Sequence, residues 1–106
     1  LKIKNSIEDQ YKTKVHFVAT DMSKQDGIDA IKEAVSANDW MVSELVNNAG
    51  FGEYGQFIER KMDKYREMIQ LNILSLTELS YHFGKEMVKR GKGRILNVVF
   101  FSSQLN

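Results

Sequence analysis

Two residue types are missing from this sequence of 106 residues: cysteine and proline. The absence of cysteine excludes disulfide bonds, thiolate catalysis and zinc–thiolate sites. The absence of proline is unusual, because average usage predicts about five prolines in a chain of this length. The chain also begins with Leu1, in a segment patterned as a helix. Together these features lead us to expect an internal piece of a longer protein.

Long apolar runs and an excess of one charge are absent as well. Fifteen basic and fourteen acidic residues give a net charge of +1, which offers no electrostatic basis for binding nucleic acid or anionic membranes. No apolar run reaches the roughly 18 residues of a membrane-spanning helix and no signal peptide is recognisable, so a cytoplasmic location is the default expectation. The two histidines, His16 and His82, lack metal-ligand spacing, so we expect no metal site.

Helical and strand-like patterns alternate along the whole chain. Apolar residues recur at spacings of three or four over residues 2–13, 23–38 and 59–89, which is the periodicity of amphipathic helices. Short β-prone runs at residues 15–19, 44–46 and 94–101 are typical of buried strands. Strands that alternate with helices of this length predict parallel βαβ units. We therefore predict one α/β domain over residues 1–106, with about three parallel strands and three helices.

The tetrad Asn47–Asn48–Ala49–Gly50 stands at the carboxyl end of the second predicted strand. Ligands of parallel sheets bind at that edge. Small residues let a flat ring or a ribose approach the backbone, and asparagine amides both donate and accept hydrogen bonds. Asn and Gly are also common turn residues, so the structural alternative is an ordinary turn. On its residue types alone, the tetrad is better interpreted as a turn.

Four segments, taken together and in order, resemble the short-chain dehydrogenase/reductase family. Leu45–Gly50 is similar to the signature after the family's fourth strand, and Asp21–Met22 is similar to the residues that close its third strand. Gln70–Ile73 is similar to the part of the long helix that carries the family's active-site asparagine, and Gly93–Val98 is similar to the fifth strand. Each match alone is weak. The set covers nearly the whole chain and makes an unrelated α/β domain a poor interpretation.

This resemblance implies a fragment of a doubly wound Rossmann fold that binds NAD or NADP. It implies an oxidoreductase that moves a hydride between the nicotinamide and an alcohol or ketone. Asp21 would accept a hydrogen bond from the adenine amino group, and the backbone of Met22 would approach the ring. Asn48, Ala49 and Gly50 would line the ribose of the cofactor.

The resemblance also gives roles to two further asparagines. Asn47 would tie the central strands together. Asn72 would bend its helix and hold a water that relays protons to a catalytic lysine. An asparagine in an otherwise apolar helix costs stability unless its amide is satisfied. The structural alternative for Asn72 is therefore a capped kink or a satisfied core amide.

The family's catalytic serine does not fall at its usual position in this sequence. The family places it three residues after the asparagine of the fifth strand, which is Phe100 when counted from Asn97. Ser102 and Ser103 follow two and three residues later, so Ser102 is the candidate if the strand end is shifted or extended. The match to the family ends at Val98, and we expect residues 99–106 to depart from native family sequence.

Two elements of the family are not found in this sequence: the glycine-rich phosphate loop and a Tyr-x-x-x-Lys motif after the fifth strand. Tyr81 and Lys85 have that spacing, but they belong to the preceding long helix, so we interpret the match as coincidence. We expect a piece of an NAD(P)-dependent oxidoreductase that is inactive in isolation and binds its cofactor weakly at best. The alternative is a non-catalytic nucleotide-binding or self-assembling structural remnant.

The fragment expectation has a consequence for the sheet. In the family's strand order, 3-2-1-4-5, the third strand has no neighbour among the strands found here. Because a lone strand with unpaired amides is unstable, we predict that residues 15–19 pair in parallel beside residues 43–46 or with another chain. The apolar flank of helix 59–89 would stay exposed in a monomer, so we expect a homo-oligomer formed through that helix.

Overall fold

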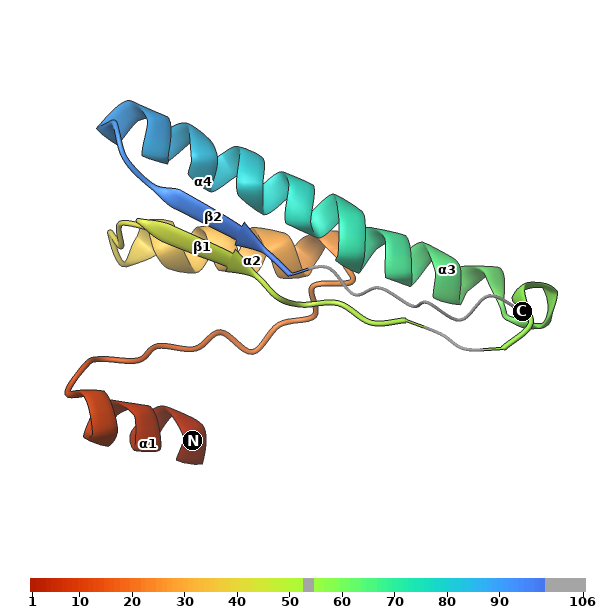
Figure 1. The fold of residues 1–106 in the computed structure, drawn as a ribbon, viewed down its shortest axis with the longest axis horizontal. Helices are drawn as coiled ribbons and strands as arrows, with labels where there is room; N and C mark the ends of the chain where they lie inside the picture. The colour runs from red at the N-terminus through yellow and green to blue at the C-terminus, as the bar shows by residue number, and fades with distance from the viewer. Residues whose placement is uncertain (53–54, 99–106) are drawn as a thin grey trace.

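Two strands, one long, interrupted helix and a shorter helix beside the strands form the body of the protein, and another short helix stands apart from it (Figure 1). The computed structural model describes residues 1–52 and 55–98. The N-terminal half contains α1 (Lys2–Tyr11), α2 (Gln25–Ala37) and β1 (Glu44–Asn47). A short 3-10 turn, η1 (Phe57–Glu59), then precedes α3 (Met62–Ile69), the π-helical turn η2 (Gln70–Ser75), α4 (Leu76–Arg90) and β2 (Arg94–Asn97).

The two strands pair in parallel, with Leu45 opposite Ile95 and Asn47 opposite Asn97. Helices α2 and α4 pack on one face of this ribbon around a core of Ile28, Leu79 and Phe83. Partly buried apolar residues pack against that core: Met22, Ile31, Val35, Val42 and Leu45. On strands, successive side chains point to opposite faces, so Val46 and Leu96 lie on the other face. Both are more than half exposed, which leaves that face of the ribbon open.

The predicted α/β class is confirmed, but the strand predicted at residues 15–19 does not form. Residues 12–20 run extended from α1 toward α2 (Figure 1), and within the described ranges β1 pairs with β2 and with no third strand. The predicted placement of residues 15–19 beside β1 is therefore wrong. Phe17 is 60% exposed, and within the described residues this β-prone run has no strand partner; the amide of Val15 donates instead to Oε2 of Glu8 at 3.0 Å. Strand propensity is local, whereas a ladder requires a partner at the right place.

The long helix predicted at residues 59–89 runs from Met62 to Arg90, with η2 in its middle. A π-helical turn admits one extra residue per turn and shifts the side chains that follow it. The helix ends at Gly91, whose φ of 79° is the left-handed conformation of a C-terminal cap. Lys89 and Arg90 in the last turn complement the helix dipole. The helix then returns the chain at once to β2.

Candidate functional site

Asn47, the last residue of β1, lies where both strands meet α4. Its side chain is buried, and its Nδ2 donates to Oγ of Ser80 at 3.1 Å and to Oδ1 of Asn97 at 2.9 Å. Its backbone carbonyl accepts from the amide of Val98 at 2.9 Å. Both amide hydrogens of the side chain are thus used. Asn47 fixes β1 against β2 and α4 at the carboxyl edge of the sheet.

The loop after β1 is held by Asn72. Its Nδ2 donates to the carbonyl of Phe51 at 2.8 Å, and its Oδ1 accepts from the amide of Phe51 at 3.1 Å. These two hydrogen bonds to one residue satisfy the side-chain amide of Asn72, which would otherwise destabilise an apolar helix. Phe51 directly follows Asn48, Ala49 and Gly50 in the chain. The loop predicted to line the cofactor is therefore anchored at its far end by the long helix.

Ser75 closes η2 and holds a second segment. Its side chain is 1% exposed, and its Oγ donates to the carbonyl of Met22 at 2.6 Å. Asn72 and Ser75 both belong to η2, and each contacts a different backbone segment, Asn72 at Phe51 and Ser75 at Met22. One helical turn thus binds the backbone at Phe51 and at Met22, and it draws together two segments that are distant in the sequence.

Asp21 forms a local turn before α2. Its Oδ1 accepts from the hydroxyl of Ser23 at 2.6 Å and from the amide of Ser23 at 2.9 Å. These two hydrogen bonds lower the pKa of the Asp21 carboxyl below its ordinary value, and the bond from the Ser23 hydroxyl has the larger effect. Asp21 is therefore ionised at neutral pH. Among the described residues its Oδ2 accepts no hydrogen bond, which leaves an exposed acceptor beside Met22.

Gly27 brings the first turn of α2 against this segment. A Cβ placed on Gly27 would lie 1.8 Å from the backbone oxygen of Asp21 and 2.5 Å from its carbonyl carbon. No side chain fits at that distance, so glycine is required for α2 to approach the Asp21–Met22 turn this closely. The position of this turn therefore depends on α2 as well as on Ser75.

Met22, Asn47, Asn48 and Ala49 line one cavity of about 190 Å³. Its other walls are apolar residues from α2, β1 and the long helix: Ile31, Leu45, Val46, Leu71, Leu76, Leu79 and Phe83. Pockets that bury a whole drug-sized ligand measure about 300–1,000 Å³. This cavity can therefore hold one part of a larger ligand, at the edge where parallel sheets bind nucleotides.

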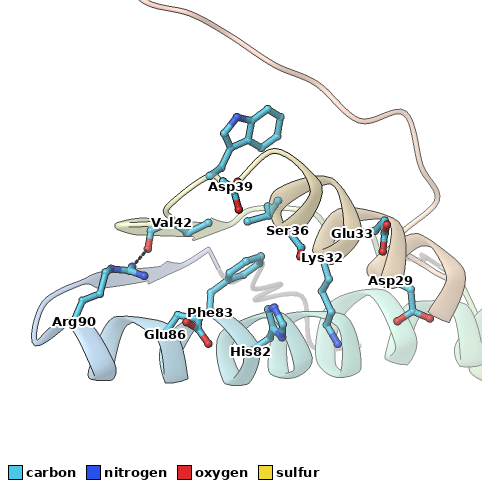
Figure 2. Close-up of a pocket in the computed structure, with 12 residues that line it drawn as sticks. Asp29, Lys32, Glu33, Ser36, Asp39, Val42, His82, Phe83, Glu86 and Arg90 are labelled. Carbon is cyan, nitrogen blue, oxygen red and sulfur yellow. Dashed lines mark hydrogen bonds between the residues drawn. The ribbon is translucent and has the colours of Figure 1, made fainter.

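A larger groove of about 610 Å³ runs between α2 and α4 (Figure 2). Its side chains carry charges of both signs and include Asp29, Glu33 and Glu86. Its two long cations are engaged: Lys32 pairs with Glu78 at 3.0 Å, and Arg90 donates to the carbonyl of Val42. None of the predicted site residues lines this groove. The cavity at the sheet edge is therefore the candidate site.

Comparison with known proteins identifies the family. The family model described as short chain dehydrogenase matches residues 1–104. This chain belongs to the short-chain dehydrogenase family. It is 35% identical over 85 residues to the uncharacterized oxidoreductase YvrD of Bacillus subtilis, which covers 79% of this chain and 32% of YvrD. It is 30% identical over 108 residues to human very-long-chain 3-oxoacyl-CoA reductase, which covers 98% of this chain and 34% of the reductase.

Solved structures of the family give the same arrangement. L-sorbose reductase from Gluconobacter frateurii, solved with NADPH and L-sorbose, superposes with a TM-score of 0.81 at 27% identity over 91% of this chain and 36% of that chain. A short-chain dehydrogenase from Sphingobium yanoikuyae in complex with NADPH superposes with a TM-score of 0.82 at 24% identity, over 91% of this chain and 37% of that chain. At this identity the similarity shows the fold alone. This short-chain dehydrogenase chain spans about a third of the length of YvrD and the human reductase.

In this short-chain dehydrogenase chain, the predicted site residues divide into three groups. Met22, Asn47, Asn48 and Ala49 share the cavity, whereas Asp21, Gly50 and Asn72 lie beside these residues in the chain or bind the loop that follows them. Ser102, the candidate catalytic serine, lies outside the described residues. Tyr81 lies on the exposed side of α4, with Nζ of Lys85 4.9 Å from its ring centroid, and neither residue lines the cavity.

Sequence reasoning missed Ser75, Gly27 and Phe51. Ser75 carries a weak signal, because it is a small polar residue three positions after Asn72 in an apolar helix. Gly27 could have been noticed as a glycine in the first turn of a predicted helix, where it lowers helix propensity. Phe51 contributes only backbone atoms, so its identity carries no signal.

None of the helices in residues 1–52 and 55–98 combines the length and the apolar character of a membrane span. No three His, Asp or Glu side chains in residues 1–52 and 55–98 gather as metal ligands.

Proposed function

We propose that this short-chain dehydrogenase chain is part of an NAD(P)-dependent oxidoreductase that transfers a hydride between the cofactor and an alcohol or ketone. The observation that carries the proposal is the set of three hydrogen bonds that the side chains of η2 make to other segments. Asn72 holds Phe51 and Ser75 holds Met22, so both predicted cofactor segments are fixed at one edge of the sheet. An ordinary surface turn at Asn47–Gly50 would not require this anchoring from a helix.

The groups at this edge fit the adenosine half of a nicotinamide dinucleotide. Asp21 offers an ionised carboxylate that can accept from an adenine amino group, and Met22 adds an apolar wall. Asn48 and Ala49 are exposed, and they offer an amide and a small side chain to a ribose. When bound, the cofactor supplies the hydride chemistry, whereas these residues bind and orient it.

Asn72 positions the loop after β1, and its side-chain amide keeps one donor and one acceptor for a further hydrogen-bond partner. An asparagine amide has two donor hydrogens and two acceptor lone pairs, and Phe51 uses one of each. We therefore propose that Asn72 fixes the loop and can also bind a water for proton relay in the full enzyme. The chain alone carries no Tyr-x-x-x-Lys motif after β2, so we propose that it binds nucleotide without turning over substrate.

The proposal is tested by titrating the chain with NADPH and NADH and following cofactor fluorescence. We expect saturable binding with a Kd below about 1 mM, equivalent to about 4 kcal/mol. Asp21→Ala should weaken binding, whereas Asp63→Ala, which removes an exposed carboxylate on α3, should leave it unchanged. Absence of saturation in the wild type, or equal effects of the two variants, would overturn the proposal. No oxidation of NADPH by an added ketone is expected.

We also propose that the chain self-associates through the long helix. Tyr81, Val88 and Ile73 are all more than half exposed on it, although apolar side chains of this size are usually buried. Val88→Lys should shift the species measured by size-exclusion chromatography with light scattering toward the monomer. The control is Glu86→Lys, which makes a charge change on the same helix. An unchanged mass for Val88→Lys would exclude this face as the contact.

A further inference from the structure

We propose that Ser75 is a positioning residue for the adenine end of the nucleotide. Resting on the proposed function, this inference assigns Ser75 the task of holding the Asp21–Met22 turn in place through the carbonyl of Met22. The bond measures 2.6 Å, joins residues 53 positions apart, and belongs to a side chain that is 1% exposed.

The hydrogen-bond partner of Ser75 differs from the usual partner of a serine within a helix. Hydroxyl side chains in helices commonly bond back to the carbonyl four residues earlier. Thr77 does this, donating to the carbonyl of Ile73 at 2.7 Å. Ser75, two residues away, donates instead to a distant segment. The hydroxyl is thus used for tertiary contact, in a turn whose π-helical geometry is itself frequent at functional sites.

The segment that Ser75 holds has few other polar ties. Residues 12–20 pair with no strand within the described ranges, and the side chain of Asp21 bonds locally to Ser23. The amide of Lys24 bonds to the carbonyl of Asp21 at 3.3 Å, which is again local. The side chain of Met22 packs against the core, and Gly27 adds a van der Waals contact with the backbone of Asp21. Loss of the Ser75 hydroxyl would leave the carbonyl of Met22 without this partner and free the turn to shift.

The Asn48–Gly50 loop, which would line a ribose, is held separately from the turn that would contact adenine. Asn72, rather than Ser75, binds Phe51, and Asn47 is fixed by Ser80 and Asn97. Ser75→Ala should therefore weaken ligands that contain adenine more than ligands that contain only nicotinamide. A residue that merely stabilised the fold would weaken both classes equally.

The test compares AMP with nicotinamide mononucleotide by NMR titration of the full 106-residue chain. We expect Ser75→Ala to raise the Kd for AMP about fivefold, equivalent to about 1 kcal/mol, and to leave nicotinamide mononucleotide within about twofold of wild type. The amide of Lys24 should exchange faster with solvent. Ser75→Thr, which keeps the hydroxyl, should restore AMP binding. Thr77→Val, which removes a hydroxyl bonded within its own helix, should behave as wild type.

Ser75→Cys fills the same buried space with a weak donor and should reproduce the AMP effect if Ser75→Ala fails to fold. If the wild type binds AMP and both variants bind it as tightly, the role of Ser75 is overturned and the proposed function stands. If the wild type binds neither mononucleotide, the proposed function fails and this inference fails with it. Equal weakening of both ligands would reduce Ser75 to a structural residue.

Discussion

Replacing Gly27 by alanine tests whether α2 sets the position of the Asp21–Met22 turn. The new Cβ would lie 1.8 Å from the backbone oxygen of Asp21 and 2.5 Å from its carbonyl carbon. Nonbonded carbon atoms pack at about 3.5–4.0 Å. Because the clash is with backbone, no side-chain rotation relieves it, and either α2 or the turn must move by more than an ångström.

The magnitude follows from two opposing terms. Overpacking of this kind costs about 1–3 kcal/mol, whereas alanine in place of a helical glycine gains up to about 1 kcal/mol. We expect Gly27→Ala to lose about 1–2 kcal/mol of unfolding free energy. Gly84→Ala makes the same change within α4, where the Cβ would meet Cδ1 of Ile95 at an ordinary 3.7 Å. That variant should gain about 0.5–1 kcal/mol.

Urea unfolding followed by far-UV circular dichroism measures both variants against the wild type. The slope of free energy against urea should be unchanged, so that the midpoints report stability directly. Gly27→Ala should also weaken AMP binding, because the turn that carries Asp21 is displaced. The reasoning is refuted if Gly27→Ala is as stable as Gly84→Ala, or if it is destabilised while AMP binding is unaffected.

Three further predictions follow from the hydrogen bonds described above. Asn72→Ala should cost about 1–3 kcal/mol and speed hydrogen exchange at the amide of Phe51, since both backbone groups of that residue lose their partner; unchanged exchange would contradict the anchoring. Asn47→Leu should lose a similar unfolding free energy, measured by urea unfolding, and unchanged stability would mean that the side-chain amide does not tie the strands. The hydrogen bond from Lys32 lowers the pKa of Glu78 from its ordinary value of 4.5, so its stabilising contribution is present above that value and is lost as pH falls through the lower, folded-state pKa. Between pH 6 and pH 3 wild type should therefore lose more stability than Glu78→Gln, by less than about 1 kcal/mol because the pair is partly exposed; parallel pH profiles would exclude this role.

The sequence allowed the prediction of features that depend on neighbouring residues. The long helix follows from apolar spacing, and its end follows from Gly91. The family resemblance rests on segments such as Leu45–Gly50, and the family is confirmed by the match over residues 1–104. Patterns of this kind depend on residues that are close in the sequence, so they can be recognised in one part of a fold without the rest.

The features that sequence reasoning missed or misplaced depend on distant partners. Residues 15–19 have the composition of a strand, but a ladder needs a neighbouring strand, and none lies beside them within residues 1–52 and 55–98. The bond from Ser75 to Met22 spans 53 positions, and no spacing rule predicts it. The close approach of Gly27 to Asp21 likewise depends on how α2 packs, which helix propensity does not encode.

The central claim is that the Asp21–Met22 turn and the Asn48–Gly50 loop form one nucleotide site. The most direct measurement is an NADPH titration of the 106-residue chain followed by amide chemical shifts. The account predicts saturable shifts at both segments with a single Kd below about 1 mM. Shifts confined to the groove between α2 and α4 (Figure 2), or shifts at one segment without the other, would contradict it.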